Sequence, residues 1–196
     1  TVDRFEDVLV TEVLSLGTDR IKALLYRLLL EELSLRGVSV RVLYERSDSP
    51  LREKEGLPAF AGFFENPSLE KEDSGHVLIR ENGLLFDVDY QNGQKTGFFL
   101  DQKYNRQSVA RLAYGKRVLD CCTHTGAFAL NAAAGGASHV TAVDISADAL
   151  LQAAKNASLN SLSDRLDFVR ADVFDYLEAL SSRPRGEYDL IILDPP

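Results

Sequence analysis

Four aspartates follow four short apolar segments in the second half of the sequence, and their side chains could do chemistry together. Each stands at or near the end of its segment: Asp120, Asp144, Asp172 and Asp194. Carboxylates gathered at one place bind cations, hydroxyl groups and amino groups, because an ionised carboxylate only accepts hydrogen bonds. An aspartate after a strand also often caps the next helix, so each one alone carries little weight.

The elements that must position these aspartates are strands alternating with helices. The strand segments are "RVLDC", "HVTAVDI", "LDFVRAD" and "YDLIILD", separated by the helical segments "GAFALNAAAGG", "SADALLQAAKNASLN" and "VFDYLEALSS". This alternation predicts a parallel sheet covered on both faces. We therefore expect an α/β fold in residues 93–196, a Rossmann-like doubly wound sheet of which the first four strands are present.

The topology of such a sheet brings the four aspartates to one edge. Right-handed crossovers place the first three strands side by side and return the fourth beside the first. A crevice then opens between the carboxyl ends of strands one and four, where ligands of these sheets bind. Asp120 and Asp194 are expected to flank this crevice, and Asp144 and Asp172 to line its other wall.

The acidic residues restrict the expected ligand. The turn "DCCTHTG" has Gly126 as its one early glycine and lacks the G-x-G-x-x-G fingerprint of dinucleotide sites, which makes a nicotinamide oxidoreductase the weaker alternative. Carboxylates are a poor lining for a pyrophosphate, but they suit an ammonium, a sulfonium, a ribose diol or an adenine amino group. S-adenosylmethionine carries all four.

This hypothesis gives each aspartate a role. Asp144 would accept both ribose hydroxyls, as an acidic residue about 20 positions after a nucleotide turn does. Asp172 would take the adenine amino group, with Ile145 and Val173 against the ring, and Asp120 would face the methionine ammonium, directly or through water. The other expected donor contacts are Thr123, Thr125, Gly126, Phe128, Asp194 and Pro195.

The end "LIILDPP" favours a role beside the methyl donor. A strand followed by Asp-Pro-Pro gives a rigid turn that can hold the Asp194 carboxylate next to a planar base, so Asp194 is the candidate catalytic residue for base positioning. The alternative is a helix start with proline after the cap.

The adjacent Cys121 and Cys122 lack metal-ligand spacing, and their surroundings of sheet and Asp120 would raise a thiol pKa. Small buried side chains are the expectation for them, with a nucleophile as the weak alternative. His124 lies in the turn, and His76 and His139 show no metal spacing, so no metal site is expected.

Composition limits the broad class. The chain has 196 residues, and its 45% of hydrophobic residues is typical of a soluble globular protein. The net charge of −8 argues against a surface that binds nucleic acid as a whole. No apolar run reaches membrane-spanning length, and the N-terminal segment lacks a signal-peptide pattern. With two adjacent cysteines, this favours a cytoplasmic protein without a membrane partner. The chain lacks an initial Met and ends after a strand, so we expect a piece of a longer protein.

Residues 1–92 are expected to form a smaller α+β domain. "FEDVLVTEVLS" predicts a strand with Val8, Val10 and Val13 inward, "VSVRVLYER" another strand, and residues 47–75 an exposed loop. A hairpin is expected around Asn82-Gly83, and a helix from near Asp101. A further helix should run from an N-cap at Thr18 to Gly37. Its apolar stripe is expected in the core, with a partner-binding face as the alternative: Ile21, Leu24, Leu25, Leu28 and Leu29.

Several segments together resemble the class I S-adenosylmethionine-dependent methyltransferases, and specifically those that form 5-methylcytosine in large-subunit ribosomal RNA. They are "GQKTGFFLDQKYNR", "VLDCCTHTGAFALNAAAGGASHVTAVDIS", "FVRADVFDYL" and "YDLIILDPP", with "DRFEDVLV" and "YERSDSPLREKEGL" resembling that family's middle domain. The resemblance implies that Lys95, Thr96 and Phe99 border the donor pocket. The family usually has an aromatic residue where His124 stands, so that contact is not carried over.

The resemblance also implies large-subunit ribosomal RNA as the substrate, an RNA-binding domain upstream and further strands downstream. Carbon 5 of cytosine becomes nucleophilic only after a cysteine adds at carbon 6, and in this family that cysteine lies beyond Asp-Pro-Pro. The 196 residues alone are therefore expected to be inactive. Two alternatives stay open: methylation of an exocyclic amine of guanine or adenine, and a non-catalytic RNA-binding protein. The sequence leaves open whether the protein is a monomer or a dimer.

Overall fold

The computed structural model describes residues 1–182 and 186–195, so Pro196 of the Asp-Pro-Pro end lies outside the described residues. The chain divides into two compact units. The first contains Thr1–Ile79 and Val88–Leu100, and the second contains Arg80–Asp87 and the residues from Asp101 onward. The single boundary expected near Asn92 stays a prediction.

The first unit contains a four-stranded sheet with the order β1-β2-β3-β4. The strands are β1 (Val2–Phe5), β2 (Val8–Thr11), β3 (Val42–Ser47) and β4 (Phe60–Phe63). The neighbours β2 and β3 are parallel, and the two outer pairs are antiparallel. Val8, Val10 and Val13 are buried, as expected from their alternation.

The sequence interpretation missed three elements of this unit. The strand β1 was missed because a turn with a left-handed residue at Glu6 (φ 53°) separates it from β2, and the sequence pattern shows no break there. The short helix α2 (Leu51–Lys54) and the strand β4 both lie in the segment expected to be a loop. Prolines and charges near these elements concealed them, and β4 forms through its pairing with β3.

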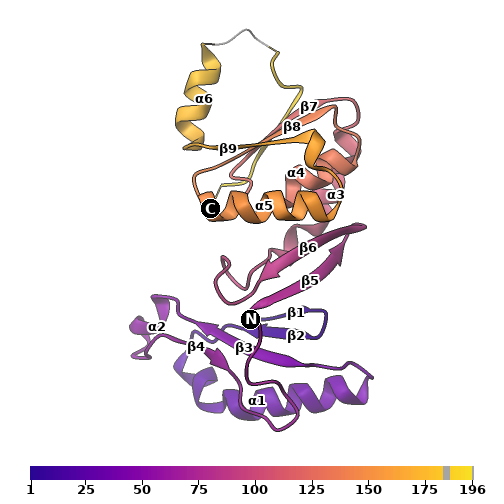
Figure 1. The fold of residues 1–196 in the computed structure, drawn as a ribbon. Coiled ribbons are helices and arrows are strands. Elements are labelled where there is room, and N and C mark those ends of the chain that lie inside the picture. Colours follow the sequence, from indigo (N-terminus) through magenta and orange to yellow (C-terminus); the bar gives the residue numbers. More distant parts are fainter. Residues whose placement is uncertain (183–185, 196) are drawn as a thin grey trace. The chain divides into compact units, whose positions relative to one another are not determined.

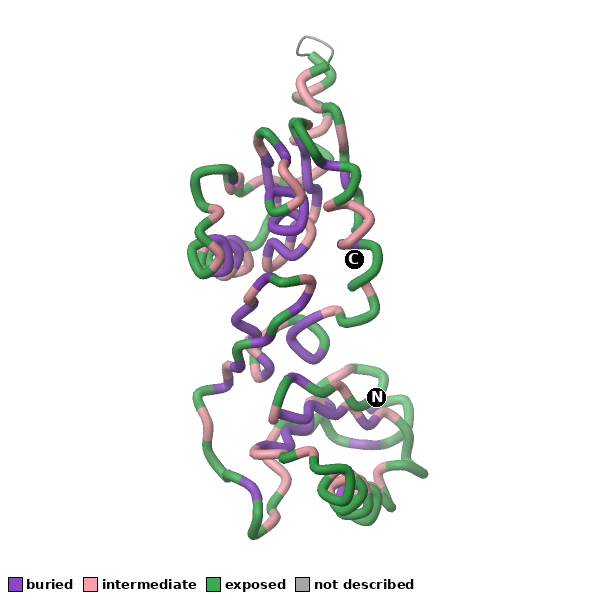
Figure 2. The backbone as a smooth tube through the Cα atoms, turned by 90° about the vertical axis from the view of Figure 1, so that its right-hand side faces the viewer, coloured by how far each residue is buried: buried purple, intermediate pink, exposed green. Residues whose placement is uncertain are grey.

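The helix α1 (Leu16–Leu35) differs from expectation in its cap and in its buried face. Ser15 is the N-cap, and its hydroxyl accepts a hydrogen bond from the Thr18 backbone N–H, so Thr18 is not the cap. The predicted core stripe is wrong at four of its five positions, because these side chains are 41–51% exposed: Ile21, Leu24, Leu25 and Leu28. Figure 2 shows most of this helix as exposed.

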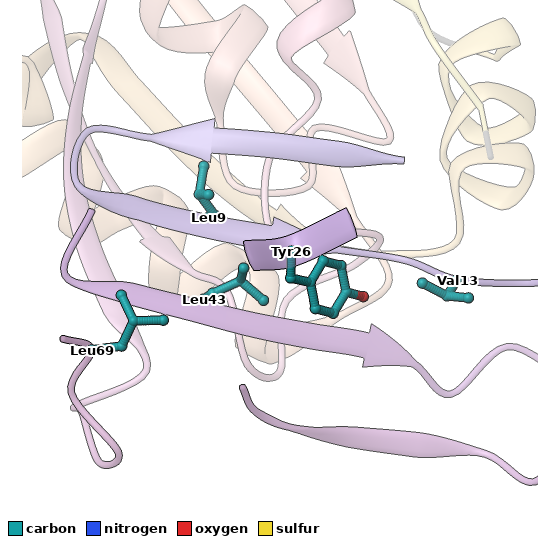
Figure 3. Close-up of a cluster of buried hydrophobic side chains, with 5 residues drawn as sticks. All are labelled: Leu9, Val13, Tyr26, Leu43 and Leu69. Atoms are coloured by element: carbon teal, nitrogen blue, oxygen red, sulfur yellow. The ribbon is translucent and has the colours of Figure 1, made fainter. Parts of the chain in front are cut away.

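A different face of α1 packs on the sheet because it carries Tyr26. This side chain is 4% exposed and lies with Leu9 and Leu43 of the strands in one apolar cluster (Figure 3). Its hydroxyl is 2.9 Å from Thr11 Oγ1 and donates to Glu45 Oε2 at 3.2 Å. A buried hydroxyl and a buried carboxylate need such partners, and this requirement sets the rotation of the helix.

A two-stranded hairpin, β5 (His76–Glu81) and β6 (Leu84–Asp89), follows. Asn82 and Gly83 have the positive φ angles, 53° and 85°, that a tight hairpin turn requires, and the hairpin expected around them is confirmed. The helix expected near Asp101 begins with a short 3₁₀ turn, Leu100–Gln102, and continues as α3 (Lys103–Leu112).

The second unit contains a parallel sheet with the order β10-β7-β8-β9. Figure 1 labels three of these strands, β7, β8 and β9. Its strands are β7 (Arg117–Cys121), β8 (His139–Asp144), β9 (Leu166–Arg170) and β10 (Leu190–Leu193). The fourth strand pairs with the first, Leu193 beside Cys121, so the predicted doubly wound order is confirmed. The reversal of order lies between β7 and β10.

Helices cover both faces of this sheet. The helices α4 (Ala127–Ala134) and α5 (Ala147–Leu159) connect the strands that build outward from β7. The helix α6 (Val173–Ser181) leads back to β10 and packs on Leu119, Cys121 and Val143, on the opposite face. Within residues 1–182 and 186–195, no helix is long and apolar enough to cross a membrane.

Candidate functional site

The four aspartates stand at the carboxyl ends of the four parallel strands. Asp120 is the penultimate residue of β7 and Asp144 the last of β8; Asp194 directly follows β10, and Asp172 directly precedes α6. All four act electrostatically on the Cys122 thiol, which lies just beyond β7. The predicted gathering of the carboxylates at one sheet edge therefore agrees with the structure.

Asp120 is 1% exposed and holds the turn between β7 and α4. Its Oδ2 accepts hydrogen bonds from Thr123 Oγ1 at 2.6 Å and from the Ala129 backbone N–H at 3.0 Å. The N-cap of α4 is Gly126, which has no side chain to bind the free N–H groups of the first turn. Asp120 thus supplies, from the strand, the acceptor that a capping side chain normally provides.

The turn itself is built from left-handed backbone. Cys122, His124 and Gly126 have φ angles of 59°, 51° and 82°. Left-handed residues other than glycine cost free energy and concentrate at binding sites, where the surroundings hold them in place. Here the Thr123 N–H donates to the Val143 carbonyl at 3.0 Å, which fastens the turn to β8.

Gly126 is required by its backbone and by close packing inside the protein. A Cβ on this residue would lie 2.9 Å from Leu130 Cδ1 and 3.0 Å from the Cβ of Ala153. The space that a side chain would need here is filled by α4 and α5. The contact of Gly126 with the donor remains a prediction.

Asp144 joins the ends of two strands. Its Oδ2 accepts the His124 backbone N–H at 2.8 Å, and its Oδ1 accepts the Ser146 N–H at 2.9 Å. A carboxylate has about four acceptor positions, so two remain for hydroxyl groups of a ligand. The cap of α5 is Ser146, so Asp144 is not needed as a helix cap.

Asp172 is the N-cap of α6 and bonds the N–H groups of Phe174 and Asp175 through Oδ1, at 2.8 and 3.4 Å. The capping explanation therefore holds for this aspartate, although Oδ2 keeps acceptor capacity. Val173 packs in the apolar cluster on the α6 face, whereas Ile145 is 64% exposed.

Asp194 and Pro195 are both exposed at the end of β10. The Asp194 carboxylate is close enough to raise the pKa of Asp120, as does Asp144. An exposed carboxylate at the point where the strand order reverses is free to meet a ligand from solvent.

Burial and negative charge weaken both thiols as nucleophiles. Burial raises the pKa of Cys121 to about 11, with Asp120 adding to it. Burial also raises the pKa of Cys122, and the four carboxylates act in the same direction. The expectation of raised thiol pKa values is thus confirmed. Burial likewise raises the pKa of Asp120 to about 7, although the bonds from Thr123 and Ala129 oppose this shift.

His124 lies beside Asp144 in the turn. Burial lowers the pKa of its imidazole, and the Asp144 charge acts against this. The ring is therefore neutral near pH 7 and gives the site no positive charge. Among the described residues, no group of three or more His, Cys, Asp or Glu side chains is arranged to hold a metal ion.

Three expected donor contacts, Lys95, Thr96 and Phe99, belong to the first unit. Thr96 is buried and its hydroxyl donates to Asp3 Oδ2 at 2.6 Å. Lys95 Nζ lies 4.7 Å from the centre of the Phe99 ring. Their role at the donor remains a prediction.

Phe128, at the start of α4, lies against a buried ion pair. The Arg106 guanidinium is 5.9 Å from the centre of the Phe128 ring and donates to both oxygens of Glu81, at 2.6 and 3.0 Å. The sequence interpretation did not identify Glu81 and Arg106 as neighbours of Phe128. Glu81 and Arg106 are 25 positions apart in the sequence, and no local pattern indicates that they pair.

Asn156 of α5 was also missed, and it bonds the turn directly: its Nδ2 donates to the Thr125 carbonyl at 3.1 Å. One sequence feature could have identified it. Asn156 follows Leu150 and Ala153 on the buried face of α5, and a polar side chain at such a position requires partners.

Comparison with known proteins shows the family of the chain. A family model described as S-adenosylmethionine-dependent methyltransferase matches residues 67–196. "Ribosomal RNA large subunit methyltransferase I" of Aeromonas salmonicida is 41% identical over 201 residues, which cover 100% of this chain and 47% of that protein. The protein of the same name from Aeromonas hydrophila is 43% identical over 204 residues, with the same coverage. The chain thus spans about half the length of the curated relatives it matches.

Solved structures show the same fold. A Streptococcus mutans structure described as a SAM-dependent methyltransferase superposes with a TM-score of 0.82 at 27% identity, covering 100% of this chain and 48% of that one. A methyltransferase structure complexed with SAH, SMU.776, gives the same TM-score and identity and is covered to 47%. Trm5b from Pyrococcus abyssi, at 20% identity and a TM-score of 0.71, shares the fold.

Proposed function

The chain belongs to the S-adenosylmethionine-dependent methyltransferase family, and from this premise we propose that the protein methylates a base of large-subunit ribosomal RNA. The RNA class is supported by the relatives named ribosomal RNA large subunit methyltransferase I, which are 41% and 43% identical to this chain. We propose carbon 5 of a cytosine as the target atom.

The observation that carries the proposal is the set of four carboxylates around the turn after β7. Such an edge attracts the ammonium and the sulfonium of S-adenosylmethionine and can accept hydrogen bonds from its hydroxyl and amino groups. When bound, this compound supplies an electrophilic methyl group. The chain's own residues bind and orient it.

The acceptor capacity of two aspartates supports their proposed roles. Asp144 keeps two acceptor positions beyond its bonds to His124 and Ser146, which suits a ribose diol. Asp172 keeps Oδ2 for the adenine amino group. Ile145 is exposed and Val173, next to Asp172 in the sequence, is only partly buried, so both can offer apolar surface to the adenine ring.

Asp120 was expected to face the methionine ammonium directly or through water, and its bonds within the turn favour an indirect role. Its carboxylate is buried and bonded to the turn, so it orders the backbone of Thr123 to Gly126 and adds negative charge behind it. We propose that this charge favours the methionine ammonium without requiring direct contact. Thr123 contributes through its hydroxyl bond to Asp120, and Thr125 through its carbonyl, which Asn156 holds in place.

Asp194 and Pro195 position the acceptor base in this proposal. Their exposure beside the strand-order reversal supports contact with a base that arrives from solvent. Methylation at carbon 5 needs a thiolate that adds at carbon 6. The raised thiol pKa values of Cys121 and Cys122 argue against both, so we propose that the nucleophilic cysteine lies outside residues 1–196.

One experiment tests the donor, the RNA class and the target atom together. The full-length protein is incubated with unmodified large-subunit ribosomal RNA and methyl-labelled S-adenosylmethionine, and the RNA is digested for nucleoside mass spectrometry. Labelled 5-methylcytidine is the expected product. Label on an exocyclic amine would overturn the target atom but keep the RNA class, and transfer to no RNA base would overturn the proposal.

A further inference from the structure

Asn156 connects the turn after β7 to the hairpin strand β6. Its side chain is 0% exposed and uses both ends of its amide. Oδ1 accepts the Asp87 backbone N–H at 2.9 Å, and Nδ2 donates to the Thr125 carbonyl at 3.1 Å. All three residues belong to the second unit, and Asp87 directly precedes the point where the chain enters the first unit at Val88.

The bond to Thr125 fixes a peptide plane at the centre of the turn. This peptide joins Thr125 to Gly126, and its N–H donates to the Thr123 carbonyl at 2.9 Å. Its carbonyl is held by Asn156 from a different element. The flanking residues His124 and Gly126 both have left-handed φ angles, so the orientation of this peptide depends on such external bonds.

The other end of this connection, Asp87 of β6, is bonded by further side chains of α5. Gln152 Nε2 donates to the Asp87 carbonyl at 2.7 Å and to Asp87 Oδ2 at 3.1 Å, and Lys155 pairs with the same carboxylate. Three residues of α5, Gln152, Lys155 and Asn156, therefore bind one residue of β6. Asn156 is the member of this group that also reaches the turn.

We propose that Asn156 is a positioning residue for methyl-donor binding: it sets the Thr125–Gly126 peptide and couples the donor turn to β6. This inference rests on the proposed function, because it assumes that the turn receives S-adenosylmethionine. Donor binding should slow hydrogen exchange at the Asp87 amide through the Asn156 side chain. Loss of that side-chain amide should weaken donor binding.

Asn160 provides a matched control one helical turn away. Its Oδ1 accepts the Leu85 N–H at 2.8 Å, and its Nδ2 donates to the Leu85 carbonyl at 2.7 Å. It therefore links α5 to the same strand with two bonds of the same kind. The bonds of its side chain reach β6 and the Asn156 carbonyl, with none recorded to the turn.

The test compares Asn156→Ala, Asn156→Asp and Asn160→Ala in the full-length protein by calorimetric titration with S-adenosylmethionine. Loss of the Thr125 bond is expected to weaken donor binding about tenfold in Asn156→Ala. Asn156→Asp keeps an acceptor for Asp87 but places a carboxylate oxygen against the Thr125 carbonyl, so it should bind donor no better than Asn156→Ala. Asn160→Ala should stay within about twofold of the parent protein.

A second readout separates positioning from stability. Thermal unfolding is measured for every variant, and hydrogen exchange at the Asp87 amide is followed with and without donor. Donor should slow this exchange in the parent protein and in Asn160→Ala, but not in Asn156→Ala. Equal donor affinity of Asn156→Ala and Asn160→Ala, or no donor effect at Asp87 in the parent protein, would overturn the inference. A parent protein that binds no donor would overturn the proposed function instead.

Discussion

The Asp144 carboxylate accepts the backbone N–H of His124 at 2.8 Å and thereby joins the end of β8 to the turn that follows β7. One side chain thus shapes the turn, and in the proposed function it also binds the ligand. A substitution at Asp144 must therefore change both the backbone of the site and its hydrogen-bonding capacity.

Asp144→Ala should weaken binding of S-adenosylmethionine at least about tenfold, because hydrogen bonds to a charged group each contribute about 1.5–3 kcal/mol. Asp144→Asn is the control, since its amide oxygen can still accept the His124 N–H while the charge is lost. Its affinity for S-adenosylmethionine, measured by calorimetric titration, should lie between those of the parent protein and Asp144→Ala. Tight binding of NADH without any heat from S-adenosylmethionine would contradict the site assignment.

Asp120 should make stability depend on pH. Its pKa in the folded protein, about 7, lies above the ordinary value of 3.8, so the folded state holds the proton more strongly. Its contribution to the free energy of unfolding is then fully present below about pH 4 and is lost as the pH rises toward 7 and beyond. Urea unfolding at several pH values should show this loss in the parent protein and a flatter profile in Asp120→Asn. Parallel profiles of the two proteins would exclude the effect.

The same residue should link donor binding to proton release. A bound ammonium favours the ionised form of Asp120, so binding near pH 7 should release protons and become tighter as the pH rises. Titrations in buffers with different heats of ionisation measure this release. Asp120→Asn should show less release, and an unchanged number of protons would assign the linkage to another group.

The two cysteines should be dispensable for methyl transfer. Because burial raises both thiol pKa values, alkylation by iodoacetamide at pH 7.5 should be slow at these positions. The variant Cys121→Ala with Cys122→Ser should keep methyl transfer within about threefold, given the small size of the changes. RNA containing 5-fluorocytosine can trap a covalent enzyme adduct. Peptide mapping of that adduct to Cys121 or Cys122 would refute this prediction.

Gly126→Ala should destabilise the second unit by about 2–4 kcal/mol, from its left-handed backbone and from contact with Leu130 and Ala153. Gly115→Ala is a suitable control, since Gly115 has a φ of 70° and no heavy atom within 4 Å of the added Cβ. It should cost about 1 kcal/mol, from the backbone alone. Urea unfolding measures both, and equal losses would show that packing at Gly126 is unimportant.

The second unit was predictable because its elements are regular and local. Short apolar strands and helices alternate from Arg117 onward, and the rule of right-handed crossovers then fixed the strand order. The positions of the four aspartates followed from that order. Their hydrogen bonds could not be predicted, because the Asp120 bond to Ala129 and the Asp144 bond to His124 depend on the three-dimensional course of the turn.

The first unit was less predictable, and α1 shows why. Both sides of this helix are apolar, so periodicity alone cannot choose the buried one. The choice depends on the hydroxyl of Tyr26, which meets Thr11 and Glu45 from separate strands. In the same way, Asn156 and Arg106 bind residues distant in the sequence, Thr125 and Glu81. No local sequence pattern shows which distant residue will be the partner.

The left-handed backbone at Cys122 and His124 limits which amino acids a saturation library can place there. Asparagine, aspartate and glycine tolerate this conformation, whereas valine, isoleucine and proline do not. Functional variants at these two positions should therefore be sorted by backbone tolerance more than by the chemistry of a thiol or an imidazole. In a library selected for methylation, asparagine and glycine should therefore be retained at positions 122 and 124, although neither can replace the chemistry of a thiol or an imidazole.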